Sequence, residues 1–171
     1  MKPANRIALS IVTLAVAAVG TIAYQAFDMT ATETAPDVAY TLLDRSQSSL
    51  HQLRGKVVLV NFWATSCASC VREMPQIAAL HERFKARGYE TLAVAMRYDP
   101  PAYVIRFAES RKLPFGVAID NTGEIAKRFG EVQLTPTSVL INQRGQIVKR
   151  FVGEPDFVAL SRLIEKLLAQ G

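Results

Sequence analysis

The chain has 171 residues, half of them hydrophobic and a fifth charged, a composition that excludes disordered, collagen-like and low-complexity proteins. Its two cysteines exclude both a four-cysteine zinc site and the multi-disulfide scaffold of a small secreted domain. The net charge is +5, but no run of basic residues exceeds two, so we predict no nucleic-acid-binding surface.

Residues 1–28 predict a membrane anchor. Lys2 and Arg6 precede the uncharged stretch Ile7–Phe27, whose 21 residues would span about 30 Å as a helix, the thickness of the hydrocarbon core of a bilayer. Because the basic residues should stay in the cytoplasm, the rest of the chain is expected to be exported. The alternative is a signal peptide that is cleaved after export. The small, polar residues 29–36 are interpreted as a tether.

Residues 37–171 alternate strand and helix patterns, which predict an α/β domain with a mixed sheet between helices. The continuous β-branched run within Lys56–Trp63 indicates a central strand that is buried on both faces, and Val38–Leu43 is predicted to be an edge strand. The remaining strands are predicted at Thr91–Met96 and Phe115–Ile119 and as a hairpin within Ser138–Val152, and the helices at Cys70–Arg87, Pro101–Lys112, Gly123–Phe129 and Asp156–Ala169.

The two cysteines, Cys67 and Cys70, lie where the central strand is predicted to end and a helix to begin. Unpaired backbone N–H groups and the helix dipole stabilise a thiolate at a helix N-terminus, so the pKa of the Cys67 thiol is expected to fall. Cys67 is therefore predicted to be the nucleophile. Cys70, one turn further along the same helical face, is predicted to be shielded and to act as the resolving thiol of a redox-active pair.

The cysteine pair has two alternative roles, as ligands of a metal and as a purely structural disulfide. A metal site would need more ligands, but His81 lies eleven residues after Cys70, about 16 Å along a helix, and His51 has no assigned place near the pair. A purely structural disulfide across so short a loop would constrain the unfolded chain little. The sequence therefore predicts neither a metal nor a bound cofactor.

Several stretches of the sequence resemble the TlpA-like thiol-disulfide oxidoreductases, membrane-tethered bacterial members of the thioredoxin superfamily. The matching stretches are Gly55–Thr65, Cys67–Cys70, Glu73–Pro75, Leu134–Thr137, Leu140–Asn142 and Gly145–Ile147. This resemblance implies a thioredoxin-like fold for residues 37–171, with Pro136 as a cis-proline that faces the dithiol. It also implies that Glu73 is a buried acid that tunes the cysteines and moves protons. Without the resemblance, the favoured interpretation of Glu73 is a first-turn glutamate that the helix dipole stabilises.

The sequence departs from the family pattern at two positions beside the cysteines. Ser66 stands where the family usually has tryptophan, and Ser69 where it often has proline, which leaves the substrate and the redox potential open. We expect Ser66, Ala68, Ser69 and Thr135 to contact the substrate, together with Trp63, which is equally compatible with core packing. Ser66 is also a candidate N-cap of the helix.

Together these features predict a periplasmic thiol-disulfide oxidoreductase anchored in a bacterial inner membrane. In the reducing direction Cys67 attacks a substrate disulfide, Cys70 resolves the mixed disulfide, and a partner reduces the pair again. The resemblance implies a membrane thiol-disulfide transporter as that donor, and exported proteins with oxidised cysteine pairs as substrates, such as apocytochrome c or copper-site proteins. The alternatives are an oxidase or isomerase that uses the same dithiol, a Cu(I)-binding chaperone and, less well supported, a thiol peroxidase.

Overall fold

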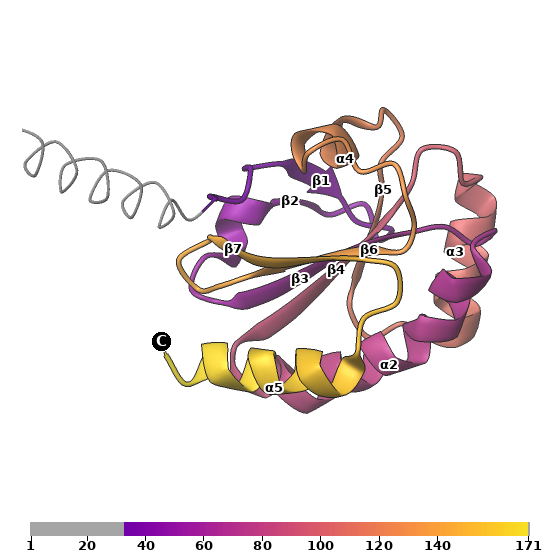
Figure 1. The fold of residues 1–171 in the computed structure, drawn as a ribbon. Helices are drawn as coiled ribbons and strands as arrows, with labels where there is room; N and C mark the ends of the chain where they lie inside the picture. Colours follow the sequence, from indigo (N-terminus) through magenta and orange to yellow (C-terminus); the bar gives the residue numbers. More distant parts are fainter. Residues whose placement is uncertain (1–32, 171) are drawn as a thin grey trace, which may run out of the picture. The chain divides into compact units, whose positions relative to one another are not determined.

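The computed structural model describes residues 33–170 (Figure 1). The expected membrane anchor at residues 1–28 and the first part of the tether lie outside this range. Within the range, no helix is long and apolar enough to cross a membrane. Residues 33–36, at the end of the expected tether, are attached to the domain, because the Glu33 carbonyl accepts a hydrogen bond from the Ile147 N–H at 2.7 Å and the N–H of the buried Ala35 donates to the Gly145 carbonyl at 2.9 Å.

A mixed sheet of five strands forms the centre of the domain, in the order β5-β4-β3-β6-β7. Strands β3, β4 and β5 are parallel, whereas β6 is antiparallel to β3 and β7 is antiparallel to β6. All seven residues of β3 are buried, as their nearly continuous apolar run predicts. The strands are β3 (Val57–Trp63), β4 (Tyr89–Ala95), β5 (Gly116–Ile119), β6 (Thr137–Ile141) and β7 (Ile147–Val152).

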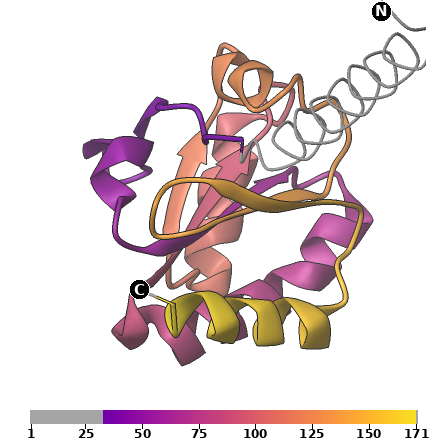
Figure 2. The same cartoon turned by 60° about the vertical axis from the view of Figure 1, so that its left-hand side comes forward.

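Helices cover both faces of the sheet, with α2 and α5 on one face and α4 on the other (Figures 1 and 2). The side chains of β3 alternate between the faces. Leu59 and Trp63 belong to the apolar cluster with α2, α3 and α5, whereas Val60 and Phe62 belong to the cluster with α4. The helices are α2 (Ala68–Phe84), α3 (Pro101–Arg111), α4 (Glu124–Arg128) and α5 (Phe157–Leu168).

The N-terminal part of the domain differs from the prediction. Strand β1 (Ala39–Thr41) pairs with β2 (Gln47–Ser49) in a separate two-stranded sheet, which is followed by the short 3-10 helix η1 (Leu50–Leu53). The strand predicted at Val38–Leu43 is present as the shorter β1, but it is not an edge strand of the central sheet, to which an isolated bridge from Leu42 to Ala118 links it. Strand β2 is too short and polar to carry a recognisable strand pattern.

The other predicted elements are present, with shifted ends. Helix α2 begins two residues before the predicted start because Cys67 is its N-cap. The predicted last turn is instead a separate 3-10 helix, η2 (Lys85–Arg87). It ends at Gly88, whose φ of 90° is one that residues with a side chain rarely adopt.

Candidate active site

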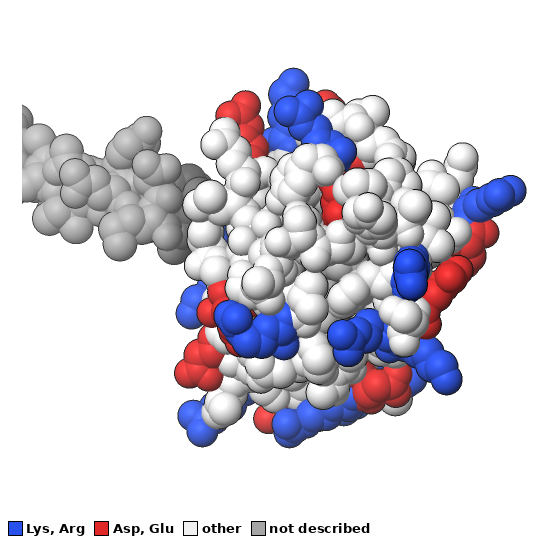
Figure 3. All heavy atoms as spheres, turned by 90° about the vertical axis from the view of Figure 1, so that its right-hand side faces the viewer, with Lys and Arg blue, Asp and Glu red and all other residues white. Residues whose placement is uncertain are grey.

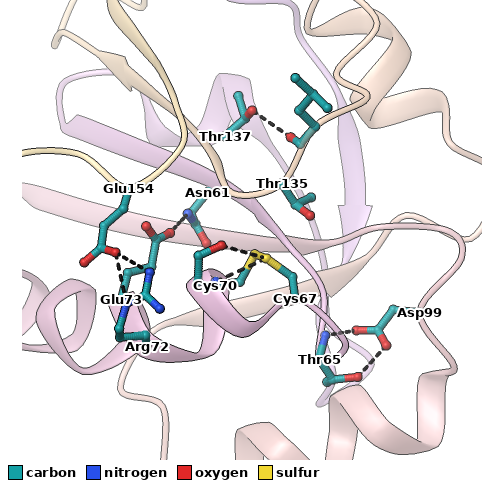
Figure 4. The surroundings of a disulfide bond; sticks show 12 residues. Asn61, Thr65, Cys67, Cys70, Arg72, Glu73, Asp99, Thr135, Thr137 and Glu154 are labelled. Carbon is teal, nitrogen blue, oxygen red and sulfur yellow. Dashed lines mark hydrogen bonds and ion pairs between the residues drawn. A yellow bond between two sulfur atoms is a disulfide. The ribbon is translucent and has the colours of Figure 1, made fainter.

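Cys67 and Cys70 form a disulfide between the end of β3 and the first turn of α2 (Figure 4), with their Cα atoms 5.2 Å apart. The Cys67 sulfur accepts a hydrogen bond from the Cys70 N–H at 3.2 Å and lies 3.4 Å from the Ser69 hydroxyl. Cys67 is half-buried, whereas Cys70 is fully buried. A substrate can therefore reach the Cys67 sulfur first, which supports the predicted roles of the two cysteines.

The residues beside the disulfide fall into two groups. Ser66 and Ala68 are exposed and Ser69 is half-buried, so all three flank Cys67 at the surface where a substrate would arrive. Ser66 is not the N-cap of α2, because Cys67 holds that position. Trp63 is fully buried, and its ring centre lies 5.1 Å from that of Phe107. The expected substrate contact of Trp63 is therefore corrected to core packing.

Glu73 lies one helical turn after Cys70 and is fully buried (Figure 4). Its Oε1 accepts a hydrogen bond at 2.9 Å from the Asn61 amide, which lies 3.0 Å from the Ser138 hydroxyl. Burial raises the pKa of Glu73 to about 7, although the Asn61 hydrogen bond opposes the rise. Glu73 is thus the buried acid that the family resemblance implies, rather than a solvated first-turn glutamate.

An ion pair lies beside the Glu73 carboxyl. The Arg72 guanidinium donates through Nη2 and Nε to Oε2 of Glu154, at 2.9 and 3.2 Å. Desolvation remains the main cause of the raised pKa of Glu73, to which Glu154 adds a smaller rise and which Arg72 opposes. Because these two charges oppose each other, the proton affinity of Glu73 is set mainly by its own burial.

The peptide bond between Thr135 and Pro136 is cis, as the resemblance implies. Pro136 is buried and leads into β6, whose first residue, Thr137, pairs with Phe62 near the end of β3. The carbonyl of Pro136 accepts a hydrogen bond from the Gly153 N–H at 2.8 Å. Thr135 is half-buried and lies across from the disulfide in Figure 4. The structure thus brings the cis-proline loop, Leu134–Pro136, to the same end of the sheet as the dithiol.

Three further residues of this region were missed in the sequence. Asn61, which holds Glu73, is a single polar residue inside the apolar run of β3, a pattern that signals a buried hydrogen-bonding group. Asp99 accepts hydrogen bonds from the N–H and hydroxyl of Thr65, and Tyr98 shares a hydrogen bond with Thr135. Asp99 and Tyr98 follow a strand in an ordinary polar loop, so nothing in the sequence marks them.

His81 is not near the disulfide. It is buried on α2 beside the rings of Tyr89 and Phe115, with ring centres 6.3 and 5.6 Å away. Burial lowers the pKa of His81, and the neighbouring Glu90 opposes that shift. Within residues 33–170, no three His, Cys, Asp or Glu side chains come together as a metal site would require.

Two large side chains beside Thr135 are exposed. Tyr98, whose hydroxyl lies 3.2 Å from the Thr135 hydroxyl, is 54% exposed, and Leu134, which precedes Thr135, is 66% exposed. Figure 3 shows the side of the molecule where α2 begins in Figure 1, on which uncharged surface is interrupted by separate Lys, Arg, Asp and Glu side chains. Exposed side chains such as Tyr98 and Leu134 suit contact with another polypeptide.

Comparison with known proteins agrees with this geometry. The sequence model of the Redoxin family matches residues 30–163. The thiol-disulfide oxidoreductase ResA of Geobacillus kaustophilus is 36% identical over 132 residues, which cover 73% of this chain and 75% of that protein. The ResA protein of Bacillus thuringiensis subsp. konkukian is 34% identical over 130 residues, with 72% and 75% covered.

Solved structures share the same fold. A protein from Neisseria meningitidis that is described as a thioredoxin superposes with a TM-score of 0.76 at 38% identity, covering 82% of this chain and 93% of that one. A thioredoxin family protein from Chlorobium tepidum superposes with a TM-score of 0.74 at 24% identity, covering 80% and 97%, and supports the fold alone.

The fold and the disulfide at the start of α2 define a thiol-disulfide oxidoreductase with a thioredoxin-like fold. The chain belongs to the Redoxin family and is a ResA-like member of the thioredoxin superfamily.

Proposed function

We propose that the protein is a periplasmic, membrane-anchored reductase of disulfides in exported proteins. The observation that carries the reductive direction is the fully buried carboxyl of Glu73 beside the Cys67–Cys70 pair. Since its pKa is raised to about 7, Glu73 can hold or release a proton at the pH at which exchange takes place.

The charge of Glu73 favours donation of electrons by the dithiol. Reduction of the disulfide creates a thiolate at Cys67, and an ionised carboxyl nearby destabilises that thiolate. A less stable reduced form gives a more negative reduction potential, since strongly oxidising dithiols are those whose reduced form is stabilised. The Cys70 N–H acts in the opposite direction through its hydrogen bond to the Cys67 sulfur. Glu73 is therefore the group that favours reductase over oxidase.

The proposed location rests on the sequence of the N-terminal stretch, and the proposed partners rest on the family resemblance. The uncharged stretch Ile7–Phe27 after two basic residues supports an inner-membrane anchor with the domain in the periplasm. Cys67 would attack the substrate disulfide and Cys70 would release the product, leaving an internal disulfide that a membrane thiol-disulfide transporter reduces. The proposed substrates are exported proteins with oxidised cysteine pairs, such as apocytochrome c or copper-site proteins.

The reduction potential of the full-length protein tests the direction. The chain is equilibrated with dithiothreitol redox buffers at pH 7, and the fraction of reduced Cys67 and Cys70 is counted by alkylation and mass spectrometry. We expect a potential near that of thioredoxin, about −270 mV, and a less negative value for Glu73→Gln. A wild-type potential near about −120 mV, typical of a strong oxidant, would contradict the reductase assignment.

The location is tested on the full-length chain in a bacterial host. We expect the protein in the membrane fraction, at its full mass, and digested when protease is added to spheroplasts. A soluble periplasmic product that lacks the first residues would instead establish cleavage of the leader. A chain that is protected in spheroplasts and digested only after lysis would contradict export.

A further inference from the structure

Two consecutive residues in the loop between β4 and α3 contact two different loops of the active site. The Asp99 carboxylate accepts hydrogen bonds from the Thr65 N–H at 2.6 Å and from the Thr65 hydroxyl at 2.5 Å. The Tyr98 hydroxyl lies 3.2 Å from the Thr135 hydroxyl. Thr65 precedes the nucleophile Cys67 by two residues, and Thr135 precedes the cis-proline. A single dipeptide thus joins the dithiol loop to the cis-proline loop, and Figure 4 shows the Asp99 half of this connection.

The Asp99 contact is strong and directional. Asp99 is 2% exposed, and a buried carboxylate is costly unless hydrogen bonds satisfy it. Both bonds come from Thr65, and hydrogen bonds to a charged acceptor are stronger than neutral ones. The Cys67 N–H also donates a hydrogen bond to the Ala64 carbonyl at 3.1 Å. Together with the bonds from Thr65 to Asp99, this bond restrains the loop from Ala64 to Cys67. The position of the Cys67 sulfur at the helix N-terminus depends on this loop.

The Tyr98 contact has a different character. The side chain is 54% exposed, although its hydroxyl is bonded to Thr135. The bond fixes the outer end of the ring beside the cis-proline loop and restrains the Thr135 side chain. Because Tyr98 is exposed and its hydroxyl contacts the residue before the cis-proline, we expect a polypeptide substrate to contact it, whereas a small reagent need not.

We propose that Tyr98 and Asp99 are positioning residues for thiol-disulfide exchange. Asp99 fixes Cys67 at the start of α2 through Thr65, and Tyr98 orients Thr135 for contact with a polypeptide substrate. The proposal rests on the exchange chemistry of the dithiol in either direction, and not on its being a reductase. The proposal therefore has an Asp99 arm and a Tyr98 arm, which can be tested separately. A small alkylating reagent reports only on the reactivity of Cys67, whereas a disulfide-containing peptide reports on Cys67 and on the contact with the cis-proline loop.

The Asp99 arm is tested with Thr65→Val, which removes the hydroxyl but keeps the shape and the charge of Asp99. The pH dependence of iodoacetamide alkylation of Cys67 is measured on the reduced full-length protein. We expect a higher pH midpoint and about two- to fivefold slower alkylation at neutral pH, because the sulfur is held less firmly at the helix N-terminus. Thr65→Ser, which keeps the hydroxyl, should restore the wild-type profile. Thr91→Val removes the hydroxyl of a buried threonine that does not contact Asp99, and should leave the profile unchanged.

A double-mutant cycle assigns this effect to Asp99. In an Asp99→Ala background, Thr65→Val should cause little further change, since the interaction is already lost. If Asp99→Ala does not fold, the comparison of Thr65→Val with Thr65→Ser still tests whether the Thr65 hydroxyl controls the reactivity of Cys67. A wild-type pH profile for Thr65→Val, or the same altered profile for both Thr65 variants, would overturn the Asp99 arm.

The Tyr98 arm is tested with Tyr98→Phe, which removes only the hydroxyl. Exchange with a disulfide-containing peptide should show a KM about two- to fivefold higher, with kcat and the alkylation profile of Cys67 unchanged. Tyr103→Phe is the matched control, since Tyr103 is 63% exposed on α3 and lies outside the site, and its kinetics should match the wild type. An unchanged KM for Tyr98→Phe, or an equal rise for Tyr103→Phe, would overturn the arm.

The assay distinguishes this proposal from the proposed function. Exchange is followed in both directions, from reduced protein with peptide disulfide and from oxidised protein with peptide dithiol. The ratio of variant to wild-type constants tests the positioning residues in either direction. If the wild-type protein oxidises the peptide dithiol faster than it reduces the peptide disulfide, the reductase assignment is contradicted. The ratios of variant to wild-type rate constants would still test whether Tyr98 and Asp99 are positioning residues.

Discussion

Replacement of Glu73 by glutamine should change how the stability of the oxidised protein depends on pH. The pKa of Glu73 is raised from an ordinary 4.5 to about 7 in the folded protein. Between these two values the unfolded chain releases the proton that the folded protein retains, so the free energy of unfolding falls as the pH rises. At 1.36 kcal/mol for each pKa unit, the loss amounts to about 3 kcal/mol, complete above pH 7 and absent below about pH 4.5.

Glu73→Gln removes this titration while keeping an oxygen that can accept the hydrogen bond from Asn61. We therefore expect the variant to gain up to about 3 kcal/mol relative to the wild type between pH 4.5 and pH 8. Urea unfolding of both oxidised proteins at several pH values measures the difference. Glu165→Gln, which removes a partly exposed carboxylate paired with Arg83, is the control. Its free energy of unfolding should change with pH nearly as that of the wild type does.

The reasoning about Glu73 would be refuted by parallel stability curves for Glu73→Gln and the wild type. It would be refuted equally if Glu73→Gln lost stability relative to the wild type as the pH rises. Either result would mean that folding does not raise the pKa of Glu73, and that this carboxyl does not exchange protons near neutral pH as the structure indicates.

Three further outcomes are expected. A limiting dose of iodoacetamide at neutral pH should label Cys67 before Cys70 in the reduced protein, and mass spectrometry that finds Cys70 labelled first would reverse their roles. Cu(I) loaded anaerobically onto the reduced protein should pass to a competing chelator while disulfide exchange remains rapid, whereas tight retention with negligible exchange would favour a copper carrier. Asp156→Ala should lower the free energy of unfolding by about 1 kcal/mol, measured in urea, because Asp156 caps α5 through the N–H groups of Val158 and Ala159.

The sequence predicted those parts of the site that depend on local structure. The apolar run of β3, the start of α2 and the spacing of Cys67 and Cys70 lie within one short stretch, so strand, helix and dithiol could be placed together. Pro136 and Glu73 could be assigned only through the family resemblance, since a cis bond and a buried glutamate leave no local pattern.

The contacts between distant segments could not be predicted. Asp99 meets Thr65 across 34 residues, and Tyr98 meets Thr135 across 37. These pairs form only because the parallel pairing of β3 with β4 and the antiparallel pairing of β3 with β6 bring three loops to one end of the sheet. Strand β2 was missed for a related reason, as its pairing with β1 depends on the tertiary structure rather than on its own short sequence.

Trapping of the exchange intermediate tests the central claim most directly. Oxidised substrate peptide is added to the reduced Cys70→Ala variant, and the products are separated without reductant and mapped by mass spectrometry. The account predicts a stable mixed disulfide between the peptide and Cys67, because the step that releases it is absent, and none in Cys67→Ala. A mixed disulfide that forms in Cys67→Ala and not in Cys70→Ala would contradict the assignment of Cys67 as the nucleophile.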